Sequence, residues 1–197
     1  MARRKHDAYY SPASFARALF RAVPEMDLRE GVRVVEPCAG GGALVDPLRR
    51  RGCEVITGDI DGRLKWDHQW DFANGAIPIL SRIGAVVTNP PYNVAEGVVR
   101  RALLIAPRVA MLLRLTWLEP CRSRRDLLER LTFVCPLHPR PSFTDDRRTD
   151  SATVAWFVWI SALRGEETGV RWILDWDRAS VGEDEVEVEE ERRRPWR

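Results

Sequence analysis

Apolar residues recur along this chain in two patterns, short β-branched runs and amphipathic segments at helical spacing. The runs predict strands at 31–36, 54–61, 83–87, 109–115, 131–137, 152–160 and 170–176. The helical spacing predicts helices at 13–23, 43–51, 95–106 and 122–131. Because strands alternate with helices, we expect an α/β fold, a doubly wound sheet with helices on both faces. No clear helix separates the strands at 131–137 and 152–160, which predicts a late antiparallel hairpin.

Composition divides the chain into a long body and a short charged tail. The 197 residues fit one domain, which we place at 1–182, with an N-terminal helical element at 7–23 that Ser11 and Pro12 begin. Residues 183–197 hold seven acids and four arginines, so the tail carries −3 and the remainder +5. The tail has little to bury, which predicts disorder. A modestly basic body is compatible with nucleic acid but does not require it.

Cysteine and histidine spacing gives no sign of a metal site. The four cysteines include no Cys-x-x-Cys pair, and the three histidines do not cluster near them. Cys38 and Cys135 lie in apolar runs, which favours reduced, buried thiols. The charged N-terminus precedes no apolar segment, and no stretch approaches membrane-spanning length, so we expect a cytoplasmic protein.

The segment Thr88 to Tyr92 follows a buried apolar run and predicts a rigid acceptor site at the carboxyl end of a strand. Pro90 and Pro91 fix φ and remove two amide donors, so their carbonyls stay available to a ligand. Asn89 adds a side-chain carbonyl and Tyr92 an aromatic face. Such a loop can hold a planar group bearing an NH2, either a base amine or a glutamine amide.

A glycine loop follows the first predicted strand. Gly40, Gly41 and Gly42 let the backbone turn tightly and approach a ligand, and a helix is predicted directly after them. A nucleotide pyrophosphate would suit such a loop as well. Glu36 precedes the glycines, however, and a carboxylate suits a cofactor with an ammonium group and repels a pyrophosphate.

Together these motifs carry a family resemblance. Asn-Pro-Pro-Tyr at 89–92, preceded by Val-Val-Glu-Pro-Cys-Ala-Gly-Gly-Gly at 34–42, resembles the S-adenosylmethionine-dependent amino-methyltransferases, most closely the DNA adenine-N6 group. The resemblance extends from Tyr9 to Ile160. It implies a Rossmann-like, seven-stranded methyltransferase sheet, S-adenosyl-L-methionine as cofactor, and residues 1–182 as the methyltransferase domain.

The resemblance also implies which residues contact the cofactor. The glycine loop would hold its methionine part, and Tyr10 lies in a Tyr-Tyr-Ser-Pro element similar to one that contacts the cofactor carboxylate. At the end of the second strand an acid can accept both ribose hydroxyls, for which we choose Asp59 over Asp61. The expected cofactor-binding residues are Tyr10, Glu36, Pro37, Ala39, Gly40, Gly42, Asp59, Ile60, Asp71 and Phe72.

On the substrate side the resemblance implies a second aromatic contact. The Arg-Pro-x-Phe pattern at 140–143 is similar to a family element whose aromatic residue packs on the target base, so Phe143 and Arg140 are expected to bind substrate. Arg147 and Arg148 are further candidates for phosphate contact. Arg114 interrupts the apolar run at 109–115, where it either reaches the active face or marks the end of the strand.

The catalytic residues expected from this reading are Asn89, Pro90, Pro91 and Tyr92. They would accept the amine protons of a flipped or single-stranded adenine and position its N6 for methyl transfer, with DNA a better partner than RNA. No segment is large enough for a recognition domain, which predicts weak sequence specificity, a partner subunit or a homodimer. An RNA adenine or guanine methyltransferase, a protein-glutamine methyltransferase and an inactive nucleic-acid-binding subunit stay open.

Overall fold

The computed structural model describes residues 13–76, 81–141, 153–174 and 176. The predictions for Tyr10, for Ser11 and Pro12, for Phe143, Arg147 and Arg148, and for the tail at 183–197 lie outside these residues. No helix among the described residues is both long enough and apolar enough to cross a bilayer.

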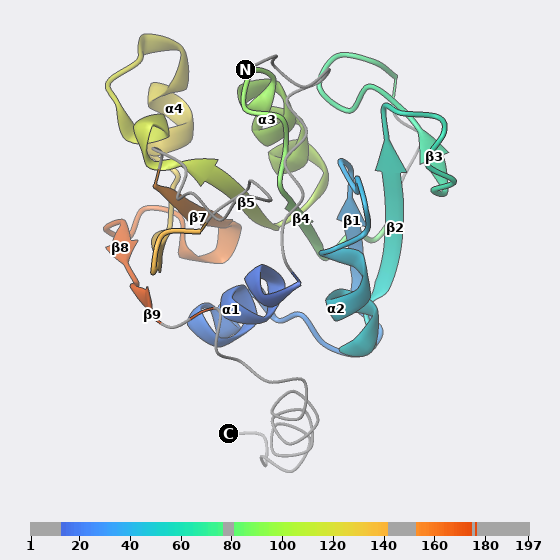
Figure 1. Ribbon diagram of the computed structural model, residues 1–197. Coiled ribbons are helices and arrows are strands. Elements are labelled where there is room, and N and C mark those ends of the chain that lie inside the picture. The colour runs from blue at the N-terminus through green and yellow to red at the C-terminus, as the bar shows by residue number, and fades with distance from the viewer. Residues whose placement is uncertain (1–12, 77–80, 142–152, 175, 177–197) are drawn as a thin grey trace.

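Nine strands of the described chain form one sheet (Figure 1). Their order is β3-β2-β1-β4-β5-β7-β6-β8, and β9 also pairs with β6. The strands are β1 (Arg33–Glu36), β2 (Glu54–Asp59), β3 (His68–Gln69), β4 (Ala85–Thr88), β5 (Arg108–Arg114), β6 (Phe133–His138), β7 (Val154–Ile160), β8 (Gly169–Val170) and β9 (Ile173–Leu174).

Strand direction divides the sheet in two. From β3 to β5 all neighbouring strands are parallel, whereas β7 pairs antiparallel with both β5 and β6. This arrangement confirms the expected Rossmann-like sheet and its late antiparallel hairpin. The hairpin does not form the outer edge, because β8 and β9 continue the sheet beyond β6.

Helices cover both faces of the sheet, with α1 and α2 on one face and α3 and α4 on the other (Figure 1). They begin and end close to the predicted positions, except that 122–131 is not one helix. There Ser123 donates to Glu96 and Arg100 donates to the Ser123 carbonyl, and these contacts with α3 fix a turn before α4 begins. The helices are α1 (Ser14–Ala22), α2 (Val45–Arg50), α3 (Ala95–Ile105) and α4 (Arg125–Leu128), with short 3-10 turns η2 (Pro24–Met26), η3 (Leu115–Leu118), η4 (Arg122–Arg124) and η5 (Ser161–Leu163).

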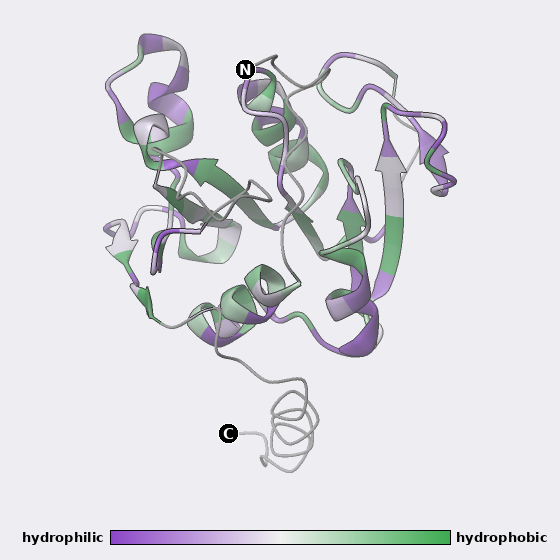
Figure 2. Cartoon of the chain, viewed as in Figure 1, coloured by the Kyte–Doolittle hydropathy of each residue, from purple (hydrophilic) through white to green (hydrophobic). Residues whose placement is uncertain are grey.

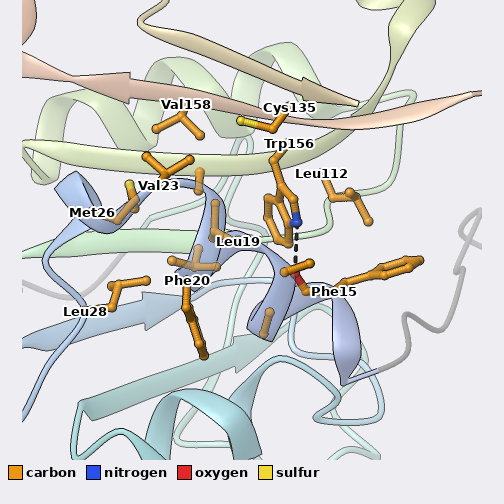
Figure 3. Packing of buried hydrophobic residues seen from close by; sticks show 14 of the residues in the cluster. Phe15, Leu19, Phe20, Val23, Met26, Leu28, Leu112, Cys135, Trp156 and Val158 are labelled. Carbon is orange, nitrogen blue, oxygen red and sulfur yellow. Dashed lines mark hydrogen bonds between the residues drawn. The ribbon is translucent and has the colours of Figure 1, made fainter. Parts of the chain in front are cut away.

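The apolar core has two layers because successive residues of a strand face opposite sides of the sheet. On the α1 side, Phe15 packs with Leu112 and Trp156, and the Trp156 Nε1 donates to the Phe15 carbonyl at 3.0 Å (Figure 3). On the α3 side, Leu113 and Phe157 belong to the second cluster. The central strands β1, β4 and β5 are accordingly hydrophobic, and β3 at the edge is hydrophilic (Figure 2).

Candidate active site

Residues from the carboxyl ends of several parallel strands line one pocket. It contains about 590 Å³ of empty space, including its open mouth. Ligands of doubly wound sheets bind at this edge, so the position fits a binding site. The lining residues are Pro37, Cys38, Asp59, Ile60, Trp70, Asp71, Phe72, Ala73, Asn74, Pro91, Asn93, Val94 and Val98.

Six of these residues were expected at the site from the sequence. Pro37 follows β1, Asp59 ends β2, and Asp71 follows β3, although long stretches of chain separate them. Ile60 and Phe72 lie beside these acids, and Pro91 comes from the loop after β4. The pocket therefore brings cofactor-side candidates together with one residue of the expected catalytic loop.

The glycine loop is held in a conformation that requires glycine at two positions. Gly40 has φ +49° and Gly42 has φ +84°, in the left-handed region that side chains disfavour. The Gly40 N–H donates to Asp59 Oδ2 at 2.8 Å, and the Ala39 N–H donates to the Gly58 carbonyl at 2.9 Å. These bonds tie the loop after β1 to the end of β2, so the two expected parts of the cofactor site form one unit.

Two tryptophans fix this loop from its sides, a role that the sequence analysis did not assign. Trp66 Nε1 donates to the Gly40 carbonyl at 3.0 Å, and Trp70 Nε1 donates to the Pro37 carbonyl at 3.0 Å. A Cβ on Gly42 would lie 2.9 Å from the Trp66 ring. Since indole nitrogens of buried tryptophans need acceptors, the Trp-rich segment at 66–72 was a signal for such contacts.

Glu36 lies at the end of β1 and is 1% exposed. Its Oε1 accepts the Cys38 N–H at 3.0 Å. Burial raises the pKa of the Glu36 carboxyl to about 8, and the charge of Asp59 adds to this rise. Glu36 does not line the pocket. The raised pKa of this carboxyl favours the neutral acid at pH 7, where the sequence suggested a carboxylate.

A second buried polar group lies next to Glu36. The Thr88 hydroxyl at the end of β4 is fully buried and makes no well-aligned hydrogen bond with any described residue. It is close enough to stabilise the ionised forms of Glu36 and Cys38. Cys38 itself lines the pocket, and burial raises the pKa of its thiol far above the ordinary value.

The other two acids already accept backbone N–H groups. Asp59 Oδ1 accepts the Asp61 N–H at 2.9 Å, in addition to the Gly40 bond. Asp71 Oδ1 accepts the N–H groups of Ala73 and Asn74, each at 3.1 Å. Each carboxylate oxygen has more than one acceptor position, so these bonds orient the acids and leave acceptor capacity toward the pocket.

Asp61, the competing choice for the ribose contact, is directed elsewhere. Its carboxylate accepts from the exposed Arg63 side chain at 2.8 Å, and it does not line the pocket. The geometry thus favours Asp59 over Asp61 as the acid at the end of β2.

The expected catalytic loop lies directly after β4. Pro90 is buried and Asn89 is half-buried. The Pro91 carbonyl accepts the Val94 N–H at 3.1 Å, a bond that closes the turn into α3. Tyr92 packs against both core clusters, and the guanidinium carbon of Arg114 lies 4.6 Å from its ring centroid. Arg140, the described substrate candidate, is exposed after β6.

Comparison by sequence gives no match to a known protein family and no match to a curated protein. Comparison by structure gives matches at low sequence identity. PH1948 of Pyrococcus horikoshii, provisionally an RNA methyltransferase, has a TM-score of 0.59 at 18% identity over 81% of this chain and 91% of its own. A dimethyladenosine transferase from Plasmodium falciparum has a TM-score of 0.57 at 14% identity over 77% of this chain and 62% of its own.

A third match is the methyltransferase subunit of a type I restriction-modification system from Streptococcus thermophilus. Its TM-score is 0.63 at 13% identity, over 92% of this chain. The present chain spans only 52% of that subunit. At these identities the matches establish architecture. This chain therefore has the fold of the S-adenosylmethionine-dependent methyltransferases.

Proposed function

We propose that this protein is an S-adenosylmethionine-dependent methyltransferase that modifies an exocyclic amine of nucleic acid, adenine N6 in DNA. The observation that carries the proposal is the shared pocket. It joins Asp59, Asp71 and Phe72, which fit a nucleoside, to Pro91 of the Asn-Pro-Pro-Tyr loop. The structural matches to nucleic-acid methyltransferases support the same substrate class.

The described residues fit the cofactor by their chemistry. Asp59 has acceptor capacity for ribose hydroxyls, Ile60 is 48% exposed at the pocket, and Phe72 offers a ring beside Asp71. Glu36 is the acid available to an ammonium group, once it ionises. When bound, the cofactor supplies an electrophilic methyl group on its sulfonium.

The protein contributes position and electrostatics to the transfer. The Asn89 side-chain carbonyl and the Pro90 carbonyl accept hydrogen bonds from the two N–H groups of the target amine, which directs the nitrogen lone pair away from the loop. Tyr92, with Phe143, replaces the stacking that the base loses on leaving a duplex. No strong general base is required, because the amine nitrogen is neutral before transfer, and the acidic, positively charged nitrogen that methylation would leave can release its proton to water.

We also propose that the chain has little built-in sequence recognition. Its described residues are accounted for by the sheet and its covering helices, and the structural match from the restriction system is about twice as long. Target choice would then come from a partner subunit or from a substrate that needs little reading. Methylation mapping on random-sequence DNA tests this: a single long motif found without a partner would defeat the proposal.

The decisive experiment is transfer of a tritium-labelled methyl group to DNA, RNA and protein fractions. We expect label in DNA, in the N6 position of adenine. Asn89→Ala should lower the rate at least about a hundredfold, as loss of a transition-state acceptor does, and leave cofactor affinity unchanged. Gln69→Ala, which removes an exposed side-chain amide outside the pocket lining, is the matched control. Label in RNA or protein alone would refute the DNA assignment, and absence of cofactor binding would favour an inactive subunit.

A further inference from the structure

Arg114 ends β5 and lies beside the loop that follows β4. The register pairs Thr88 with Met111, so residues 112–114 continue past the end of β4, alongside the loop at 89–92. Strand alternation places Arg114 with Leu112, which packs on the α1 side of the sheet. The pocket residues Trp70 and Phe72 pack on the α3 side. Arg114 is therefore across the loop from the pocket that we assign to the cofactor.

The Arg114 side chain is half-buried, and no described acid pairs with its charge. Its Nε is fully buried, and within 13–76, 81–141, 153–174 and 176 the structure gives this nitrogen no hydrogen-bond acceptor and its guanidinium no acid. Its described contact is the face of the Tyr92 ring, at 4.6 Å from the centroid. Other arginines of the fold, such as Arg29 and Arg171, have carboxylates within 2.7 Å.

A buried, charged donor without an acceptor destabilises the free protein, and an anionic ligand at the guanidinium can offset this loss. Arginine stays charged at any accessible pH, so it cannot relieve burial by losing a proton. A buried donor to which no acceptor is offered costs roughly 1–3 kcal/mol, and more when it is charged. The missing group is therefore an acceptor, and the uncompensated charge calls for one that is anionic.

We propose that Arg114 binds the backbone phosphate of the target nucleotide, next to the base held by the Asn89 loop. The inference rests on the proposed nucleic-acid substrate and names how that substrate is anchored. A base edge offers neutral acceptors and would leave the charge uncompensated, whereas a phosphate can accept from the Nη end of the guanidinium and compensate its charge. From the same position the guanidinium packs on the Tyr92 ring. Arg114 would therefore hold both the phosphate and the aromatic ring on which the target base stacks.

The test is the salt dependence of binding. Wild-type protein and the variants Arg114→Met and Arg114→Lys would be titrated with a fluorescent single-stranded oligonucleotide in the presence of S-adenosylhomocysteine, at several NaCl concentrations. We expect Arg114→Met to weaken binding on the order of tenfold, and to reduce the slope of log K against log salt by about 0.7, the value of one phosphate contact. Arg114→Lys keeps the charge and should keep the slope.

Arg29→Met is the matched control, because Arg29 precedes the amino end of β1, whereas Arg114 lies at the carboxyl end of β5, and Arg29 pairs with Asp27. It should leave the slope unchanged. An Arg114→Met variant that keeps the full slope overturns the inference, as does a loss of affinity that depends on the base and not on salt. Urea unfolding of each variant checks the fold, and Arg114→Gln replaces the Met variant if that one does not fold. If wild-type protein binds no nucleic acid, the proposed function fails instead.

Discussion

Replacing Glu36 by glutamine should make the free protein more stable and its cofactor binding weaker. The Glu36 carboxyl is 1% exposed, and burial raises its pKa from an ordinary 4.5 to about 8. In the unfolded chain the same carboxyl ionises near its ordinary value. Between these two values the unfolded state binds fewer protons than the folded state, so the free energy of unfolding falls as the pH rises.

The size of the effect follows from the pKa difference. Between the two pKa values, each pH unit lowers the free energy of unfolding by roughly 1.4 kcal/mol. When the pH reaches 8, the total decrease approaches about 5 kcal/mol as an upper bound. Glutamine has the same shape and cannot ionise. Glu36→Gln should therefore remove this pH dependence and raise the free energy of unfolding by several kcal/mol at pH 8.

Cofactor binding should respond in the opposite direction. Glu36 must ionise to pair with the cofactor ammonium. Its carboxyl is ionised in about one protein molecule in a hundred at pH 6 and in about half of the molecules at pH 8. The affinity of the wild type should therefore rise roughly fifty-fold between these values, with one proton released on binding at low pH. The glutamine variant should bind more weakly at pH 8 and show little pH dependence.

Two measurements check this prediction. Urea unfolding of the free protein at pH 6 and pH 8 gives stability, and calorimetry with S-adenosylhomocysteine, in two buffers of different ionisation enthalpy, gives affinity and proton release. Glu54→Gln, at an exposed acid on β2, is the control and should change neither. Equal pH slopes for wild type and Glu36→Gln would refute the neutral buried acid, and equal affinities would refute its role as the ammonium ligand.

Three further substitutions have defined outcomes. Gly58→Ala would put a Cβ 2.2 Å from the Trp70 ring, so the free energy of unfolding should fall by about 1–3 kcal/mol in urea titrations. The second substitution Trp70→Leu should restore it, and unchanged stability of Gly58→Ala would contradict this packing. Trp156→Phe removes the donor to a buried α1 carbonyl and should lower the free energy of unfolding by about 1–3 kcal/mol in the same assay; an unchanged value would contradict a role for this bond in stability. Asp59→Asn offers one carbonyl oxygen to two backbone N–H groups, so calorimetry should give a cofactor affinity lower on the order of tenfold, and an unchanged affinity would exclude Asp59 as a ligand.

Sequence patterns predicted the six longer strands β1, β2, β4, β5, β6 and β7 well, because buried strands leave a continuous apolar signature. The single strand predicted at 170–176 was wrong, since β8 and β9 are separate two-residue strands there, and β3 is too short to leave a signature and was not predicted. The run at 109–115 corresponds to β5 at Arg108–Arg114, with Arg114 at its end. The helix at 122–131 was predicted wrongly, because its contacts with α3 come from residues far away in the chain. Local spacing carries no information about such contacts.

Some features of the candidate site could likewise be predicted from the sequence, and others could not. Asp59 could be placed near the pocket because it ends a predicted strand at the ligand-binding edge of the sheet, and Phe72 because the Asp-Phe pair resembles the family element. The bonds from Trp66 and Trp70 to the glycine loop could not, since they depend on how a long connection folds back over β1 and β2. The neutral state of Glu36 also depends on burial, which only the assembled sheet provides.

The position of β7 has a consequence for synthesis on the ribosome. This strand is among the last to emerge, yet it fills the middle of the sheet, between β5 and β6, with all seven residues buried. A nascent chain that has already made every described pocket residue still exposes the unpaired edge of β5. Fragments ending before residue 154 should therefore be prone to aggregation, even though they contain those residues.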